Sequence, residues 1–291
     1  MKQILCGMVL LVLTGGSANA ANFTPLGDLR FGAVESQALG ISADGSVVVG
    51  YASGKLGREA FRWTGGVMTS LGDLPDGSFY SHANRISADG SVVVGVGRSA
   101  SGGEAFRWTG GVMTGLGDLP GGSFSSKAND VSADGSVVVG YATSASGQEA
   151  FRWTGGVMTG LGDFAGGSFS SRANGVSADG SVVVGSGSIV YPVEDDVPPG
   201  DAAFIWTADG GMEQLFDVLV ARGATGLTGW TLATANAISA DGQWIAGTGY
   251  NPLGQTEAFL ANIAPVPIPP AVCLFGSALG VMGWMRRKAV A

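Results

Sequence analysis

The chain has 291 residues, and its 23 Asp and Glu against 15 Lys and Arg give a formal net charge of −8 at pH 7. This acidity argues against a nucleic-acid partner, because an acidic surface repels the phosphates that supply most of that affinity. The single histidine, His82, excludes a histidine-rich metal site, and the two cysteines, Cys6 and Cys273, lie near the chain ends, so the domain between them has no thiolate for zinc or catalysis.

The first predicted element is a secretory signal peptide over residues 1–20. Lys2 precedes an apolar run from Ile4 to Leu13, and the small residues Ala18 and Ala20 mark a cleavage site. The apolar run is too short to span a bilayer. We therefore expect an exported domain that begins at residue 21.

Three phrases then recur five times each along residues 21–263, and four of the units are near copies while the last is divergent. SADGSVVVG begins at Ser42, Ser87, Ser132 and Ser177, at a spacing of 45 residues, and returns as SADGQWIAG at Ser239. The other two phrases are AFRWTGGVMT, first at Ala60, and LGDL, first at Leu26. A fixed period of this length indicates a repeat architecture.

Each unit carries the signals of four short antiparallel strands, because Asp-Gly and Gly-Gly turns separate runs rich in Val, Phe and Trp. In the third unit we expect strands at residues 127–132, 136–142, 149–154 and 157–163. Four strands in about 45 residues are typical of a propeller blade. The prediction is an all-β fold, a five-bladed β-propeller of four-stranded blades, with an open β array or another β fold as the alternative.

The two ends of the domain predict how the ring closes. Residues 23–29 carry the phrase that ends a unit, whereas the last unit stops after its third-strand phrase at residues 258–263. We expect the N-terminal strand to pair into the last blade and so hide both edges.

Repeated polar and aromatic residues are interpreted as structural. The turn aspartates Asp44, Asp89, Asp134, Asp179 and Asp241 each precede Gly and are expected to cap hairpin turns, with a chain of Ca²⁺ sites as the alternative. A second series, Asp28, Asp73, Asp118, Asp163 and Asp217, is expected at strand ends rather than as a cation-binding collar. The tryptophans Trp63, Trp108, Trp153 and Trp206 are expected between blades rather than as sugar-stacking platforms. Apart from Ca²⁺, no cofactor or metal is expected.

One insertion breaks the period, since Asp179 and Asp241 lie 62 residues apart instead of 45. Part of the added length falls in residues 187–201, where Tyr191, Glu194, Asp195 and Asp196 are the predicted binding residues. A solvated loop without a ligand is the alternative. No catalytic grouping stands out from the repeats, although a glycosidase with two carboxylates stays open.

The C-terminal end combines a Pro-rich linker over residues 264–270 with a tail over residues 271–291. The tail contains a short hydrophobic segment, expected to be helical, followed by Arg286, Arg287 and Lys288. The prolines favour an extended linker, and the basic residues are expected to stay on the cytoplasmic side of a membrane.

The C-terminal segment and the repeats each resemble a known family. The segment VPIPPAVCLFGSALGVMGWMRRK resembles the PEP-CTERM sorting signals of Gram-negative bacteria, in a variant built on Val266, Pro267 and Pro269. It implies an exosortase-type membrane transpeptidase as partner, membrane association through the tail before processing, and delivery to the cell surface or an exopolysaccharide matrix. The repeats resemble the HAF family of extracellular repeats, with Glu-Ala-Phe at Glu59, Glu104 and Glu149 in place of His-Ala-Phe.

The sequence therefore predicts a non-catalytic surface or matrix protein that binds polysaccharide or another envelope component weakly. A glycan-cleaving propeller enzyme and a purely structural spacer are the two alternatives.

Overall fold

The computed structural model of the chain describes residues 23–30, 33–189 and 200–264. Several predictions lie outside these residues: the signal peptide with Ala18 and Ala20, the insertion residues Tyr191, Glu194, Asp195 and Asp196, and the sorting residues Val266, Pro267, Pro269, Arg286, Arg287 and Lys288. Within the described part, no helix has the length and apolar character needed to cross a membrane.

The described residues fold almost entirely into antiparallel strands, one group for each repeat. The first group is β1 (Ser36–Ile41), β2 (Val47–Ser53), β3 (Arg58–Thr64) and β4 (Val67–Ser70). The second is β5 (Ser81–Ile86), β6 (Val92–Ser99), β7 (Gly102–Thr109) and β8 (Val112–Gly115), and the third is β9 (Gly121–Val131), β10 (Val137–Ser144), β11 (Gly147–Thr154) and β12 (Val157–Gly160). The fourth is β13 (Ser171–Val176), β14 (Val182–Ile189), β15 (Gly200–Thr207) and β16 (Gly211–Gln214), and the last is β17 (Thr231–Ile238), β18 (Trp244–Tyr250) and β19 (Thr256–Asn262).

Each group is a blade-like sheet whose strands pair in sequence order. The first and fourth sheets have four strands, and the last has three. The second and third are joined into one sheet by a single parallel bridge between Gly103 and Ser125. The all-β prediction and the four-strand unit are thus confirmed for the first four repeats.

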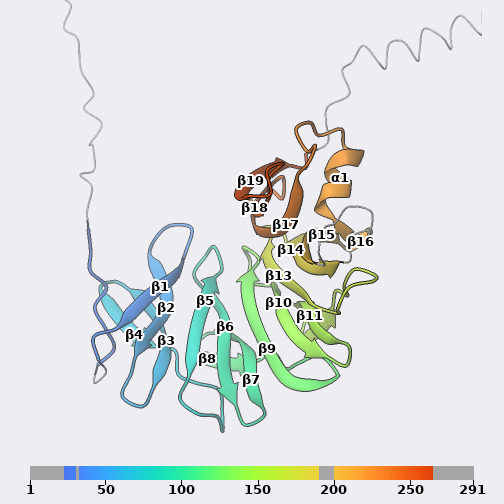
Figure 1. Cartoon of the computed structure of the whole chain (residues 1–291). Helices are drawn as coiled ribbons and strands as arrows, with labels where there is room; N and C mark the ends of the chain where they lie inside the picture. Colours follow the sequence, from blue (N-terminus) through green and yellow to red (C-terminus); the bar gives the residue numbers. More distant parts are fainter. Residues whose placement is uncertain (1–22, 31–32, 190–199, 265–291) are drawn as a thin grey trace, which may run out of the picture.

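The sheets follow one another along an open arc, as Figure 1 shows. The first strands β1, β5, β9, β13 and β17 contact one another in that order. Hydrogen bonds fix this order: the amide of Ala88 donates to the carbonyl of Ala133 at 3.0 Å, and the Nδ2 of Asn129 donates to the carbonyl of Ala173 at 2.8 Å. Equivalent backbone bonds join every consecutive pair of sheets.

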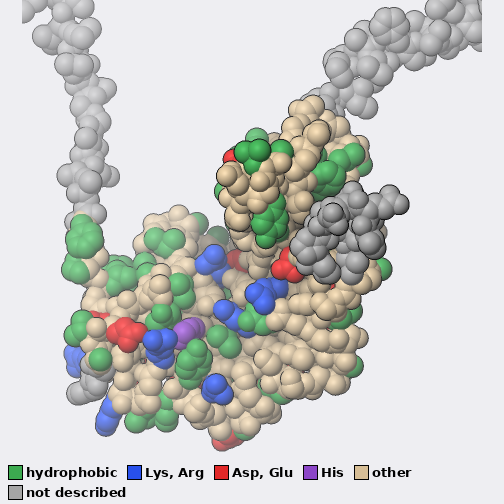
Figure 2. All heavy atoms as spheres, viewed as in Figure 1, with side chains coloured by type: hydrophobic (Ala, Val, Ile, Leu, Met, Phe, Trp, Pro, Cys, Tyr) green, Lys and Arg blue, Asp and Glu red, His purple; other side chains and the backbone are tan. Residues whose placement is uncertain are grey.

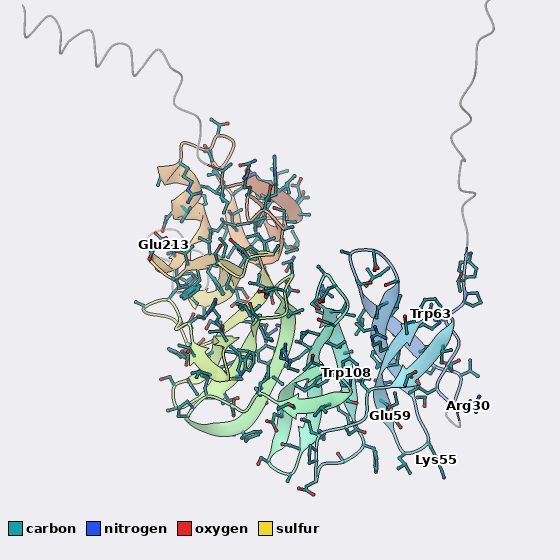
Figure 3. The ribbon with its side chains drawn as sticks, turned by 180° about the vertical axis from the view of Figure 1, so that it is seen from behind. Arg30, Lys55, Glu59, Trp63, Trp108 and Glu213 are labelled. Carbon is teal, nitrogen blue, oxygen red and sulfur yellow. The ribbon has the colours of Figure 1, made fainter. Side chains whose placement is uncertain are left out.

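The hydrophobic core is divided among the spaces between neighbouring sheets. Phe61, Phe106, Phe151 and Phe204, one from each third strand, are completely buried. One cluster joins Val47 and Val49 of the first sheet to Val93 and Phe106 of the second. Trp63 and Trp108 lie on the third strands of neighbouring sheets (Figure 3) and pack against such clusters. The continuous valine runs therefore belong to strands that are covered on both faces.

The predicted closure of the ring is wrong in this structure. Residues 23–29 form no strand, and they do not pair with the last sheet, which consists of β17, β18 and β19. Instead Leu29 is buried with Ala52 and Phe61, and the Oγ of Ser36 donates to the carbonyl of Gly27 at 2.9 Å. The physical reason is the repeat itself: the equivalent Leu71 and Leu74 also pack against the sheet that follows them, so this phrase docks onto the next sheet.

The fourth repeat departs from the others after β16. The phrase LFDV begins the helix α1 (Leu215–Ala221), with Leu215 fully buried. In the other copies the second residue is Gly27, Gly72, Gly117 or Gly162, with φ of 76°, 80°, 80° and 82°. Phe216 occupies this position, and a residue with a Cβ disfavours that left-handed conformation, so the chain follows a helical path here.

Candidate binding groove

One column of the repeat differs in every copy although its neighbours hardly change. This position lies on the first strand of each repeat, five residues before the Ser of the SADG phrase, and it holds Gln37, His82, Lys127, Arg172 or Thr234. In the second sheet its neighbours Ser81 and Ala83 are fully buried. Because side chains alternate along a strand, this variable residue points to the opposite face, away from the packed core. The copies therefore differ where they face the interior of the arc.

Two of these residues, Lys127 and Arg172, line a groove of about 370 Å³ on the inner face of the arc. Its lining residues come from all five repeats: Leu39, Asn84, Arg85, Lys127, Asn129, Tyr141, Arg172, Asn174 and Asn236. Figure 2 shows Lys and Arg side chains and the histidine gathered over this face. We call this surface the basic groove. It is a concentration of positive charge on a protein whose net charge is −8.

Arg85 is held in place by contacts to three repeats. Its Nη1 donates to the carbonyl of Leu39 at 2.9 Å and to that of its neighbour Asn84 at 3.1 Å, and its Nε lies 3.8 Å from the Oδ1 of Asp130. The Oδ2 of Asp130 accepts a bond from the amide of Val176 at 3.0 Å. Burial raises the pKa of Asp130, while these two partners favour its charged form.

Lys127 and Arg172 carry the charge of the groove further along the arc. Partial burial, and secondarily the charge of Arg172, lower the pKa of Lys127. The guanidinium of Arg172 lies over the ring of Tyr141, 4.8 Å from its centroid. Because the charge of Arg172 disfavours the protonated form of Lys127, an anion bound between them would relieve this repulsion.

An aromatic stack continues the groove toward the first sheet. The ring of His82 stacks on Tyr51 with centroids 4.1 Å apart and on Tyr80 at 4.7 Å. Arg58 and Arg98 cover the two tyrosine rings at 4.9 and 5.9 Å. Partial burial, followed by the charges of Arg58 and Lys127, lowers the pKa of His82, so the imidazole is neutral at pH 7 and acts as part of an aromatic surface.

The groove thus offers two kinds of recognition side by side. Guanidinium and ammonium groups bind carboxylates, sulfates or phosphates through charge-assisted hydrogen bonds. Tyrosine and imidazole rings provide flat apolar faces with polar edges, which suit the alternating polar and apolar faces of a sugar. Side-chain amides of Asn84, Asn129 and Asn174 border the groove, but each donates to the carbonyl of the next sheet.

The turn aspartates lie outside this groove. Asp134 accepts hydrogen bonds from the Oγ of Ser132 at 2.7 Å, the amide of Ser136 at 2.9 Å and its Oγ at 2.8 Å. Asp44, Asp89 and Asp179 accept the same three bonds in their own turns. In the last repeat Asp241 accepts bonds from Ser239 and the amide of Gln243.

The second aspartate series lies at the connections between sheets. Asp73 accepts a bond from the amide of Tyr80 at 3.1 Å, and Asp118 from the amide of Ser125 at 2.7 Å. Asp217 lies in the first turn of α1. Among the described residues, no three His, Cys, Asp or Glu side chains are grouped as a metal site would require.

The groove residues were missed by the sequence analysis, which placed binding in the insertion around Tyr191. The repeats contain a signal for these residues: at one aligned position the residue changes in every copy, whereas the two flanking positions hardly change. Only the structure shows which face of the sheet this position occupies.

No protein-family model matches the chain, and no similar curated protein is found. Among solved structures the chain is similar to TolB from Acinetobacter baumannii, at 13% identity over 78% of this chain and 54% of that one, with a TM-score of 0.46. It is also similar to a putative TolB from Agrobacterium tumefaciens, at 19% identity over 83% and 78% of the two chains, with a TM-score of 0.48. An acylaminoacyl peptidase matches at 13% identity over 78% of this chain and 37% of that one, with a TM-score of 0.48.

Proposed function

We propose that this protein is an exported, non-catalytic binding protein that holds an anionic polysaccharide in the basic groove. The observation that carries the proposal is the row of His82, Lys127 and Arg172 at one repeat position. A repeat that otherwise keeps much of its sequence carries a cationic or aromatic side chain at this position in three of its five copies, and these three face the inside of the arc.

The ligand we propose is a glycan that carries carboxylates, such as a polyuronate. Arg85, Lys127 and Arg172 would bind the carboxylates, and the rings of Tyr51, Tyr80, His82 and Tyr141 would stack against the sugar faces. The groove runs across several sheets, so successive sugars of one extended chain would contact successive repeats.

Export and sorting belong to the same proposal. The signal peptide over residues 1–20 would direct the chain out of the cytoplasm, and the tail over residues 271–291 would present it to an exosortase-type transpeptidase. Delivery to the cell surface or the exopolysaccharide matrix would bring the groove to its ligand. What supports this step is the order of Pro-rich linker, apolar segment and Arg286-Arg287-Lys288 in the sequence.

Binding is tested with the purified domain over residues 21–263, using a polyuronate and a neutral glucan of the same length in titration calorimetry. We expect binding of the polyuronate alone, with affinity that falls as salt is raised, because screening weakens the ionic contacts. Replacing Lys127 and Arg172 with Gln should weaken binding about tenfold or more.

The control variant replaces Arg30 and Lys55 with Gln. It removes the same charge from the edge of the first sheet (Figure 3), and we expect it to bind as the unaltered domain does. Equal loss in both variants would mean that net charge rather than the groove decides binding. Release of sugar fragments would instead support the glycan-cleaving enzyme, and no binding of either polymer would support the spacer.

A further inference from the structure

The last sheet lacks the strand that every earlier repeat supplies. In the first four repeats the third strand pairs with a short fourth strand, as β3 does with β4 and β15 with β16. β19 is the corresponding third strand, and it pairs with β18 alone among the strands that the structure describes. Its other edge therefore presents unpaired backbone groups, which readily accept another strand.

Both ends of the arc also expose apolar side chains that are buried in the interior of the array. Trp244 is 45% exposed where the equivalent Val47 is 3% exposed, and Leu260 is 68% exposed where Ile205 is 4% exposed. At the opposite end, Ile41 is 63% exposed where Ile86 is 9% exposed. The two end surfaces are thus the two halves of the contact that joins neighbouring sheets within the chain.

The N-terminal segment carries the phrase that the last sheet lacks. Phe23-Thr24-Pro25 precedes Leu26-Gly27-Asp28-Leu29 just as Met68-Thr69-Ser70 precedes the second LGDL phrase. Residues 68–70 belong to the fourth strand β4. Phe23 is 88% exposed, while Leu29 is buried against the first sheet of its own chain.

The register of β3 with β4 shows how this segment would pair with β19. Trp63 lies opposite Met68 and Phe61 opposite Ser70, and the amide of Leu71 donates to the carbonyl of Ala60 at 2.8 Å. Since hydrogen-bonded and non-hydrogen-bonded pairs alternate, the amide of Ser70 points away from β3. Pro25 takes the place of Ser70, so its missing N–H costs no hydrogen bond on this outer strand.

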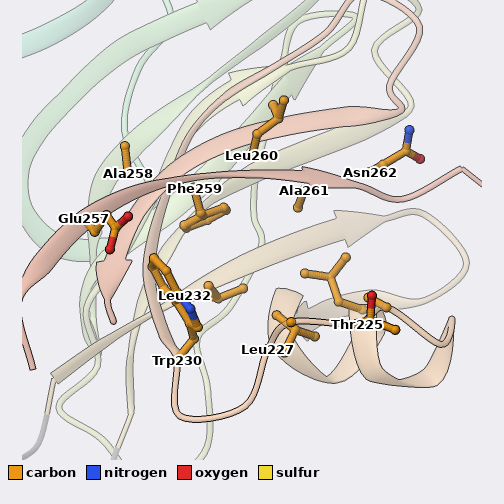
Figure 4. Close-up of a pocket in the computed structure, with 13 residues that line it drawn as sticks. Thr225, Leu227, Trp230, Leu232, Glu257, Ala258, Phe259, Leu260, Ala261 and Asn262 are labelled. Carbon is orange, nitrogen blue, oxygen red and sulfur yellow. The ribbon is translucent and has the colours of Figure 1, made fainter. Parts of the chain in front are cut away.

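The same register puts Phe23 opposite Ala261. The earlier repeats have a large residue at this position of the third strand, such as Trp63, and Met68 opposite it. In the last repeat the small Ala261 borders a pocket of about 490 Å³ whose apolar lining includes Leu219, Leu227, Trp230 and Leu232. Figure 4 shows Phe259 and Ala261 directed toward the side of the sheet where Leu227, Trp230 and Leu232 lie, and Leu260 directed away. A phenylalanine ring opposite Ala261 would enter this pocket, because directly opposed side chains share one face of a sheet.

We propose that a second copy of this chain fills the edge, with its Phe23-Thr24-Pro25 segment added to β19 as the fourth strand. Within one chain the first and last sheets lie at the two ends of an open arc (Figure 1), and Leu29 keeps the segment at the first sheet. The docked copy would cover Trp244 and Leu260 with its own first sheet. Such a head-to-tail contact uses different surfaces on the two partners and can repeat along a filament. This inference does not depend on glycan binding.

The pairing is tested by disulfide cross-linking of the full chain in which Cys6 and Cys273 are replaced by Ser. One variant adds Phe23→Cys and another adds Ala261→Cys. We expect a disulfide-linked dimer when the two are mixed under oxidising conditions, because a non-hydrogen-bonded pair brings Cα atoms to about 4.5 Å, within disulfide range. The control mixture pairs Phe23→Cys with Asn262→Cys, whose side chain points to the other face, and it should cross-link weakly.

Association in solution gives the second measurement. The mass of the chain by sedimentation should rise with concentration, and Phe23→Asp should raise the apparent dissociation constant about tenfold or more. Val157→Asp, which alters an exposed apolar residue of the third repeat, away from both end sheets, should leave it unchanged. The proposal is overturned if the chain carrying both Phe23→Cys and Ala261→Cys forms only an internally linked monomer, which would mean closure within one chain. It is equally overturned if no cross-link forms.

Discussion

At the scale of single residues, the Asp-Gly turns show how a short polar network fixes a hairpin. In the third repeat Ser132 donates to Asp134 and accepts a bond from the amide of Val137 at 2.9 Å. The hydrogen bond from the amide of Ser136, with those from the hydroxyls of Ser132 and Ser136, lowers the pKa of Asp134 to about 2. Similar bonds lower the pKa values of Asp44 and Asp89 to about 2.

These low values predict a loss of stability in acid. Each carboxylate has a pKa near 3.8 when unfolded and about 2 when folded, so its contribution is complete above about pH 4 and is lost as the pH falls toward 2. We expect the melting temperature, followed by circular dichroism, to fall through this window. The triple variant Asp44→Ala, Asp89→Ala, Asp134→Ala should start from a lower melting temperature and show a shallower fall.

The matched control is Asp209→Ala, at an exposed turn outside these motifs. Its acid profile should follow that of the unaltered chain. An equally steep fall in the triple variant would show that these turns are not responsible for the acid sensitivity.

At the scale of elements, a glycine in the second strand lets the first strand approach closely. A Cβ on Gly140 would overlap the carbonyl oxygen of Lys127, and one on Gly95 would overlap that of His82. The pairing of β9 with β10 shifts register next to Gly140, between Val139 and Gly140. The glycine therefore also determines where the backbone of a groove residue lies.

Gly140→Ala should lower the free energy of unfolding by about 2 kcal/mol or more, because the overlap can be relieved only by moving the backbone. It should also weaken polyuronate binding, since Lys127 would shift. Gly103→Ala is the control, because a Cβ there meets no atom within 4 Å. Chemical denaturation measures the free energy of unfolding of the two variants. Equal stability of Gly140→Ala and Gly103→Ala would contradict this account of the glycine.

At the scale of the whole molecule, sheet-to-sheet bonds hold the arc together. The amides of Asn84, Asn129 and Asn174 each reach the carbonyl of the following sheet. Asn236 has the same repeat position in the last sheet, but its Nδ2 donates to Thr248 within that sheet, at 3.1 Å. The asparagine at this repeat position thus links neighbouring sheets in the interior of the array, whereas in the last sheet it is exposed and makes no such link.

Asn129→Ala should therefore cost about 1 kcal/mol or more, because it leaves a partly buried carbonyl without its partner. Asn236→Ala should change stability by less than about 0.5 kcal/mol. Thermal unfolding of both variants, measured at one low protein concentration, compares them directly. A larger loss of stability in Asn236→Ala than in Asn129→Ala would contradict the role of the asparagines as links between neighbouring sheets.

The sequence could predict most of the fold and little of the candidate site. The third repeat shows the extent: strands were expected at residues 136–142 and 149–154, and β10 and β11 cover Val137–Ser144 and Gly147–Thr154. Turn chemistry and runs of Val and Phe are local signals, so they can be detected without knowing the packing. The groove was missed because His82, Lys127 and Arg172 are 45 residues apart and become neighbours only when the sheets are placed side by side.

The sequence alone determined the repeat, the all-β class and the four-strand unit, because these depend on periodicity and on residues close together in the chain. Only the tertiary structure decided where the ends of the array go and which face carries the charge. Closure depends on whether the summed rotation between five sheets brings the first to the last, and no single repeat encodes that angle. The direction of Lys127 and Arg172 depends on which face of each sheet packs against the next, and this too is a property of the assembled arc.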